Sequence, residues 1–201
     1  MAQRLILIRH GDLGESCRGC YIGRTDVPLS AEGRRQAAAL AGELGPLNGA
    51  HILCSPLLRC RETAGIALGA GATLDLDDDL REIDFGRWEG MSFAEVAAAD
   101  PAAVDRWAAL DEVFAFPGGE GSGAFRERIG AAAGRIADDP AGTVVAITHG
   151  GAIRLFICRF LGLDYRQYLL FDVRPASISE IRIEDGRGVL TRVNDTHHLE
   201  G

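Results

Sequence analysis

Two histidine–glycine pairs, each placed directly after an apolar run, are the residues best suited to do chemistry in this sequence. Arg9, His10 and Gly11 follow the first run, and His149 and Gly150 follow a later one. In an open α/β sheet, ligands bind beyond the carboxyl ends of the strands. A neutral imidazole there can attack phosphorus, and a neighbouring guanidinium can hold phosphate oxygens through two hydrogen bonds. The pattern therefore predicts an anion-binding site at strand ends.

The charge of the chain limits which partners it can bind. The formal net charge is −8, and all 21 basic residues are arginines. A negative surface disfavours nucleic acid and anionic membranes, and we expect neither as a partner. A small phosphorylated substrate is still compatible, because a local cationic cluster can oppose the overall sign. Without lysine, such a cluster must use guanidinium groups, histidine or backbone amides.

Alternating strand and helix patterns predict the fold. The chain has 201 residues, 47% of them hydrophobic, which suits a single domain over residues 1–201. Serines at 30 and 92 can cap helices, and Asp185-Gly186 suits a tight hairpin. We predict an α/β fold, a three-layer α/β/α sandwich with a mostly parallel central sheet and one antiparallel edge strand. The expected strands are 4–8, 51–54, 74–76, 144–148, 178–183 and 189–193.

Neither a targeting segment nor a metal site is expected. No apolar run is long enough to span a bilayer, and residues 1–9 do not resemble a signal peptide, so we expect a cytoplasmic protein. The five cysteines are scattered, which does not suit a disulfide framework. Cys17 and Cys20 form a C-x-x-C pair without a second pair to complete a zinc site. We predict no metal and no cofactor.

Five blocks spread along the chain form an ordered set of motifs. They are Arg9-His10-Gly11 with Gly19-x-Tyr21-x-Gly23-x-Thr25-Asp26-x-Pro28-Leu29, Ser55-Pro56-Leu57-Leu58-Arg59-Cys60-Arg61-Glu62-Thr63-Ala64, Leu80-Arg81-Glu82-x-x-Phe85-Gly86-x-Trp88-Glu89-Gly90, Thr148-His149-Gly150 and Asn194-Asp195-Thr196-x-His198-Leu199. In this order they resemble the histidine phosphatase (phosphoglycerate-mutase-like) superfamily. One block alone is weak evidence, whereas five in order are strong.

The resemblance implies a role for each residue. His10 would be the nucleophile that forms a phosphohistidine, and Glu82 would protonate the leaving alcohol. His149 would assist His10 and offset the phosphate charge. Asp84 and Glu89 are close enough in sequence to be alternatives to Glu82. The implied phosphate-binding residues are Arg9, Arg59, Ser16 and Gly11.

The chain also departs from the family pattern near the site. Many members carry asparagine where this chain has Ser16, and a hydroxyl residue where it has Leu13. We expect backbone amides near Gly11 to replace the missing contact. The residues expected at the mouth of the site are Arg24, Arg18 and Tyr21.

The length and the loop motifs are most similar to the α-ribazole-phosphate phosphatases of cobalamin synthesis. The implied function is a metal-independent phosphomonoesterase, a hydrolase of a small ester such as α-ribazole 5′-phosphate. Two alternatives stay open, a phosphoglycerate-type mutase and a non-catalytic phosphate-binding module. Aromatic residues at 88, 107, 114 and 116 suit either a substrate ring or the core. The sequence does not predict the oligomeric state.

Overall fold

A computed structural model describes residues 1–45, 47–69, 71–184 and 187–200 of the chain. Its centre is a six-stranded mixed sheet in the order β3-β2-β4-β1-β5-β6. The neighbours β3, β2, β4 and β1 run parallel, and β5 runs antiparallel to both β1 and β6. The strands are β1 (Arg4–Arg9), β2 (His51–Cys54), β3 (Asp75–Leu76), β4 (Thr143–Thr148), β5 (Ile178–Glu184) and β6 (Arg187–Asp195).

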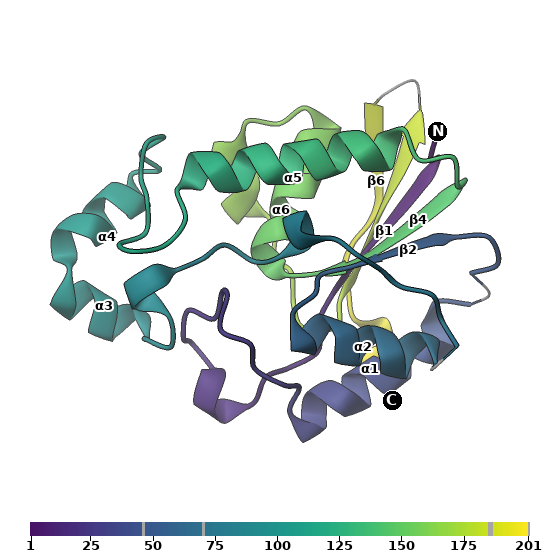
Figure 1. The fold of residues 1–201 in the computed structure, drawn as a ribbon, viewed down its shortest axis with the longest axis horizontal. Helices are drawn as coiled ribbons and strands as arrows, with labels where there is room; N and C mark the ends of the chain where they lie inside the picture. The colour runs from purple at the N-terminus through teal and green to yellow at the C-terminus, as the bar shows by residue number, and fades with distance from the viewer. Residues whose placement is uncertain (46, 70, 185–186, 201) are drawn as a thin grey trace.

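Helices cover both faces of this sheet (Figure 1). The pair α5 and α6 packs on one face, and the pair α1 and α2 packs on the other. The short helices α3 and α4 lie beyond the carboxyl ends of the parallel strands. The helices are α1 (Ala31–Glu43), α2 (Leu58–Leu68), α3 (Phe93–Ala99), α4 (Pro101–Ala108), α5 (Ser122–Ala137) and α6 (Gly150–Leu161).

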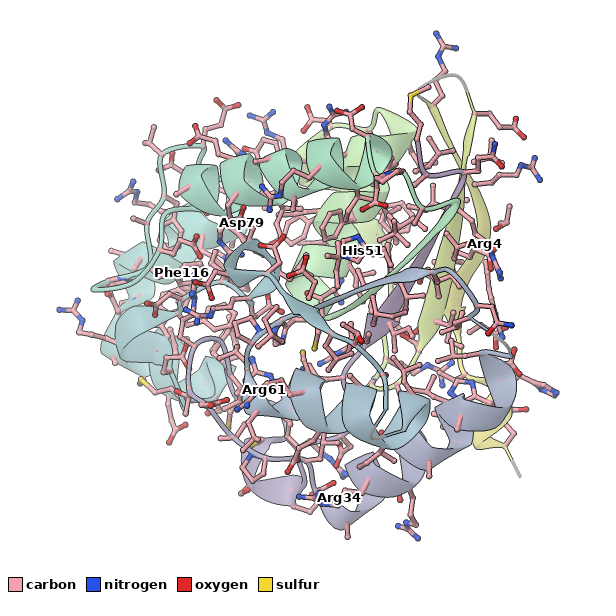
Figure 2. The ribbon with its side chains drawn as sticks, turned by 45° about the vertical axis from the view of Figure 1, so that its right-hand side comes forward. Arg4, Arg34, His51, Arg61, Asp79 and Phe116 are labelled. Carbon is pink, nitrogen blue, oxygen red and sulfur yellow. The ribbon has the colours of Figure 1, made fainter. Side chains whose placement is uncertain are left out.

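The central strands are apolar throughout because both of their faces are buried. In β1, Leu5 and Leu7 belong to the core under α5 and α6, whereas Ile6 and Ile8 belong to the core under α1 and α2. Successive side chains of a strand point to opposite faces, which explains this alternation. Charged side chains such as that of Arg34 on α1 lie at the surface (Figure 2). These two cores hold the ends of β1 and β4 in place.

Local signals in the sequence end and begin the helices as predicted. Ser30 and Ser92 are N-caps whose hydroxyls accept backbone N–H groups. Gly162 ends α6 in the left-handed conformation. The sequence pattern predicts a helix from Pro101 to about Val113, but the helix stops at Ala108, and Leu110 has a φ of 53°.

The α/β class and the mostly parallel sheet are confirmed. The antiparallel strand is β5, which lies one strand in from the edge because β6 pairs along its outer side. The predicted hairpin residues 185–186 lie outside the described residues. Within the described ranges, no helix is long and apolar enough to cross a membrane.

Candidate active site

The two histidine–glycine pairs meet at the carboxyl ends of two adjacent parallel strands. His10 follows β1 and His149 follows β4, and the last residues of these strands, Arg9 and Thr148, are partners in the sheet. The imidazole rings lie edge to face with centroids 5.2 Å apart. Both side chains are buried. The sheet register therefore brings together residues that are 139 positions apart in the sequence.

The geometry around His10 leaves one ring nitrogen free to react. Nδ1 donates a hydrogen bond to the Gly11 carbonyl over 2.8 Å, so the lone pair is on Nε2. Burial lowers the pKa of His10 well below 6.5, and the nearby guanidinium groups of Arg9 and Arg59 lower it further. A neutral imidazole with a fixed tautomer is the form required of a nucleophile.

Arg59 is fully buried, and three of its five N–H groups are engaged. Nε donates to Nδ1 of His149 over 3.2 Å, while Nη1 and Nη2 donate to the carbonyls of Thr25 and Gly23. His149 donates from Nε2 to the Ser55 hydroxyl over 2.8 Å. Burial, followed by the charge of Arg59, lowers the pKa of His149 well below 6.5. Both ring nitrogens of His149 thus bond to protein in this structure.

Glu89 organises the loop that receives Arg59. Its carboxylate accepts hydrogen bonds from the amides of Gly23, Arg24 and Thr25 and from the Thr25 hydroxyl. Burial raises the pKa of Glu89, but these bonds outweigh burial and the net pKa is lowered. A side chain at Gly23 would clash, because its Cβ would lie 2.0 Å from the Ile83 carbonyl oxygen. Glu89 therefore supports the site and does not line its cavity.

Glu82 is the carboxylate that faces the site. Its two oxygens accept hydrogen bonds from the amides of Ile83 and Gly151 over 3.0 and 2.9 Å. Gly151 belongs to the first turn of α6, whose amides carry partial positive charge. Of the three acidic residues Glu82, Asp84 and Glu89, Glu82 alone lines a described cavity. The carboxylate of Asp84 accepts a hydrogen bond from the Gly86 amide instead.

The first cavity, which we call the phosphate cavity, has a volume of about 460 Å³ and opens beside His10. Arg9 lines this cavity. Its Nη1 donates a hydrogen bond to the Val173 carbonyl oxygen over 2.5 Å. The Nε atom of Arg9 is enclosed and bonds to none of the described residues. The lining residues include Arg9, His10, Gly11, Leu13, Cys17, Arg18, Cys20, Tyr21, Glu82, Gly150, Gly151 and Arg154.

Neither Ser16 nor the Gly11 amide offers a free polar group to the phosphate cavity in this structure. Ser16 is exposed on a short 3₁₀ turn and does not line the phosphate cavity, because Cys17 takes that position. Gly11 lines the cavity, but its amide donates to the Thr63 hydroxyl over 3.1 Å. A Cβ at Gly11 would lie 2.5 Å from the Gly33 carbonyl oxygen, so glycine is needed there for close packing against α1.

The three residues predicted at the mouth of the site lie in different surroundings. Tyr21 lines the phosphate cavity and packs against Phe85 with ring centroids 5.1 Å apart. Arg18 also lines it, with its exposed guanidinium paired to Glu15. Arg24 lines neither of the two cavities beside Glu82, and its guanidinium lies 3.9 Å from Glu120.

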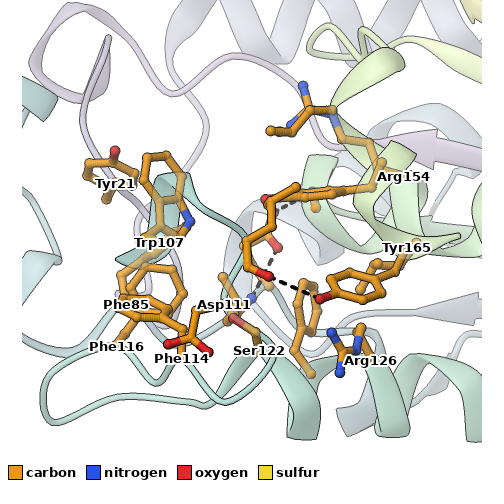
Figure 3. Close-up of a pocket in the computed structure, with 18 residues that line it drawn as sticks. Tyr21, Phe85, Trp107, Asp111, Phe114, Phe116, Ser122, Arg126, Arg154 and Tyr165 are labelled. Atoms are coloured by element: carbon orange, nitrogen blue, oxygen red, sulfur yellow. Dashed lines mark hydrogen bonds between the residues drawn. The ribbon is translucent and has the colours of Figure 1, made fainter. Parts of the chain in front are cut away.

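A second cavity of about 320 Å³, which we call the aromatic cavity, adjoins the first (Figure 3). Tyr21, Glu82, Phe85, Gly151 and Arg154 line both. Three of the four aromatic residues left open by the sequence line this cavity, and Trp88 is buried behind them. The aromatic lining residues are Tyr21, Phe85, Trp107, Phe114, Phe116, Phe125, Tyr165 and Tyr168.

Sequence reasoning missed three residues that build the site. Ser55 and Thr63 lie in the motif around Arg59, and they bond to His149 and Gly11 respectively. Arg154 lines both cavities and stands on α6, five residues after His149. The helical position of Arg154, one turn after Gly150, is the signal that could have revealed it.

The cysteines form neither a disulfide nor a metal-binding group in the described part of the chain. All five are free thiols. Burial raises the pKa of Cys54 to about 12, which leaves its thiol protonated and unreactive. A search of the described residues for three or more neighbouring metal-binding side chains finds no group.

Comparison with known proteins gives a family. The model of the histidine phosphatase superfamily (branch 1) matches residues 5–196. Phosphoserine phosphatase 1 of Hydrogenobacter thermophilus is 33% identical over 98% of this chain and 94% of its own length. The bifunctional protein Rv2228c of Mycobacterium tuberculosis is 38% identical over 98% of this chain, which spans only 55% of that protein.

Solved structures agree with this comparison. The α-ribazole phosphatase from Shigella flexneri is 29% identical, with a TM-score of 0.86 over 96% of each chain. A phosphoserine phosphatase variant from Entamoeba histolytica, in complex with phosphoserine, is 26% identical, with a TM-score of 0.82 over 98% of each chain. With a family match along nearly its whole length and a paired-histidine site at the strand ends, this chain belongs to the histidine phosphatase superfamily (branch 1).

Proposed function

We propose that the chain hydrolyses small phosphate monoesters through a phosphohistidine formed on His10. The observation that carries this proposal is the state of His10: its Nδ1 donates to Gly11, its pKa is lowered by burial, and it lines the phosphate cavity beside Arg9. Nε2 is then the only ring nitrogen with a lone pair to offer to phosphorus.

The reaction has two steps in this proposal. In the first, Nε2 of His10 forms a bond to phosphorus as the bond to the ester oxygen breaks, and protonated Glu82 gives its proton to the departing alcohol. In the second, Glu82 takes a proton from water, which attacks phosphorus and displaces His10. Inorganic phosphate leaves, and the histidine and the protonated acid are restored.

The arginines supply the positive charge that the step requires. Arg9 and Arg59 would neutralise the dianion and hold the equatorial oxygens as charge develops on them. Arg59 keeps two N–H groups without a bond to any described residue. His149 would donate to the phosphate after exchanging one of its present partners, Arg59 or Ser55. Contacts from Ser16 and Gly11 stay predictions, and they require the loop after β1 to rearrange.

The aromatic cavity supports a narrower proposal for the substrate. Because Glu82 lines both cavities, the leaving alcohol would extend from the phosphate cavity into the aromatic one. α-Ribazole 5′-phosphate has a flat aromatic base that suits these walls, whereas phosphoserine is compact and has no ring. We therefore propose α-ribazole 5′-phosphate, and with it a role in cobalamin synthesis, as the first substrate to test.

Hydrolysis of p-nitrophenyl phosphate in the presence of EDTA tests the proposed reaction. We expect activity in EDTA and its loss, by at least about 10³-fold, in His10→Ala. Full activity in His10→Ala would refute the phosphohistidine. A panel of esters that includes α-ribazole 5′-phosphate and phosphoserine then tests the substrate.

A mutase would need to protect its phosphohistidine from water. Trapping the intermediate and measuring its decay separates the two activities, since a phosphatase loses the phosphate rapidly.

The single domain over residues 1–201 and the cytoplasmic location stay predictions.

A further inference from the structure

Most arginines of this chain have their charge neutralised by a neighbouring carboxylate. Fourteen of the 21 have a carboxylate oxygen within 4.0 Å. The others form no ion pair with a described residue. Arg61, Arg159 and Arg187 are exposed to solvent.

Of the remaining four arginines, Arg9 lines the phosphate cavity and Arg59 is buried against His149 without lining either cavity. Arg9 and Arg59 belong to the phosphate site, where an anionic ligand accounts for their charge. Arg126 and Arg154 line the aromatic cavity. In a chain of net charge −8, two guanidiniums without a counter-ion in a largely apolar cavity point to electronegative ligand atoms.

Of these two arginines, Arg154 is the one placed to meet a ligand near the reacting ester. Its Nε donates to the Phe171 carbonyl over 2.8 Å, which orients the guanidinium, and its terminal nitrogens bond to none of the described residues. Arg126 stacks on the Tyr165 ring at 3.7 Å, and its Nη1 is enclosed. Figure 3 shows both arginines across the cavity from Tyr21 and Trp107.

The position of Arg154 relative to Glu82 defines which part of a substrate it would touch. Both side chains line both cavities, so they stand at the junction where the ester oxygen of a bound substrate would lie. A group bound by Arg154 must therefore be close to the ester oxygen, on the alcohol half. The aromatic wall opposite it favours a flat ring in the same half.

We propose that Arg154 is a specificity-determining residue that binds an acceptor oxygen on the alcohol half of the substrate, close to the ester. This inference rests on the proposed function. The substrate class is a phosphate ester of a ring-bearing alcohol with a carboxylate, or a sugar oxygen, next to the ester carbon. A carboxylate would balance the charge of Arg154, which has no counter-ion among the described residues, and a sugar oxygen is the acceptor that α-ribazole 5′-phosphate would offer.

Four esters separate the possibilities. Phenyl phosphate has the ring alone, 2-carboxyphenyl phosphate has a carboxylate beside the ester, 4-carboxyphenyl phosphate has it at the far end, and ribose 5-phosphate has sugar oxygens. For each ester, kcat/KM is compared between the wild type and Arg154→Met, so that differences between leaving groups cancel in the ratio. Arg159→Met is the matched control, because Arg159 is exposed on the same helix and also lacks an ion pair.

We expect Arg154→Met to lose at least about tenfold in kcat/KM on 2-carboxyphenyl phosphate, and less than about threefold on phenyl and 4-carboxyphenyl phosphate. A selective loss on ribose 5-phosphate instead identifies a sugar oxygen as the ligand atom. Arg154→Lys, which keeps the charge, should recover part of the loss on the carboxylate ester. A thermal melt of each variant checks that it is folded.

An equal loss on all four esters, or no loss on any, would overturn the role of Arg154. Failure of the proposed function gives a different result. In that case the wild type cleaves none of the esters, or His10→Ala cleaves them as well as the wild type does.

Discussion

The Nε–H group of Arg59 donates to Nδ1 of His149, and both side chains are fully buried. Because Nδ1 accepts this bond, the proton of the neutral ring is on Nε2, where it faces the Ser55 hydroxyl. Arg59 also holds the carbonyls of Gly23 and Thr25. One guanidinium thus joins the second histidine to the loop after β1, and this pairing needs the planar fork of arginine.

Replacing Arg59 with lysine should disable the site although the charge is kept. The ammonium group cannot make the three divergent bonds, so we expect kcat/KM to fall by at least about 10²-fold. Arg61→Lys is the control, because Arg61 is exposed on the same helix. Near-normal activity of Arg59→Lys on p-nitrophenyl phosphate would contradict this account.

Glu89 should matter through the loop and not through proton transfer. Glu89→Gln removes the charge that accepts the bonds of residues 23–25, and we expect an unfolding free energy lower by roughly 1–3 kcal/mol. The lowered pKa of Glu89 means that its contribution is present above its ordinary value of 4.5 and is lost as the pH falls through the lowered pKa. Denaturation in urea at pH 7 and pH 3 measures both effects. Loss of activity without loss of stability would instead support a chemical role.

The proposed proton donor predicts a dependence on the leaving group. Glu82→Gln cannot protonate an alcohol, so we expect a loss of about 10²–10⁴-fold on an alkyl phosphate and a much smaller loss on p-nitrophenyl phosphate, whose leaving group needs no proton. Asp84→Asn is the control, because Asp84 bonds to Gly86 away from the cavity. Equal losses on both esters would argue against Glu82 as the acid.

His10 should stay active in mild acid. Its lowered pKa keeps the imidazole neutral below pH 6.5, and protonation removes the lone pair only when the pH falls through that lowered value. We therefore expect the rate of enzyme phosphorylation, measured by rapid quench at saturating substrate, to hold from pH 7 to below pH 6.5. An acid limb centred above 6.5 would show that His10 is not held in the neutral form.

His51 offers a test of pH-dependent stability away from the site. Its bond to Asp139, followed by a longer one to Asp75, raises its pKa against the opposing effect of partial burial. Because the pKa of His51 is raised in the folded protein, its protonated form stabilises the fold. This contribution is fully present below pH 6.5 and is lost as the pH rises through the raised pKa. His51 is labelled in Figure 2 at the start of β2. Because the His51 side chain is 35% exposed, we expect it to contribute at most about 1 kcal/mol to the free energy of unfolding.

The measurement for His51 compares unfolding free energies of the wild type and His51→Gln at pH 5.5 and pH 9. The difference should be larger at the lower pH. His197→Gln, which changes an exposed histidine, should show little difference at either pH. A difference that grows at pH 9 would contradict the assigned sign.

Local patterns predicted the elements of this fold because local physics controls them. The buried strands β1 and β4 are continuous apolar runs, and the caps at Ser30 and Ser92 depend on a few neighbouring residues. The end of α4 was predicted too late, since periodicity continues past the point where the backbone at Leu110 leaves the helix.

The site was predictable only where motifs carried it. The motif resemblance assigned the acid to Glu82 and left Asp84 and Glu89 as alternatives, because only the tertiary structure shows which carboxylate faces the cavity. Likewise, the exposure of Ser16 and the engagement of the Gly11 amide by Thr63 arise from contacts between distant segments. Arg154 went unnoticed because its environment depends on the packing of α6 beside Phe171.

The boundary position of Glu82 has a consequence for engineering. The phosphate cavity is walled mainly by residues 9–22 and the start of α6, whereas the aromatic cavity takes much of its wall from residues 107–126 and 165–169. Side chains of these latter stretches that face the aromatic cavity can therefore be changed without altering the residues that surround His10. Under the proposed function, a library of substitutions at those cavity-facing positions is the means to select for other alcohol groups while His10, Arg9 and Glu82 are kept.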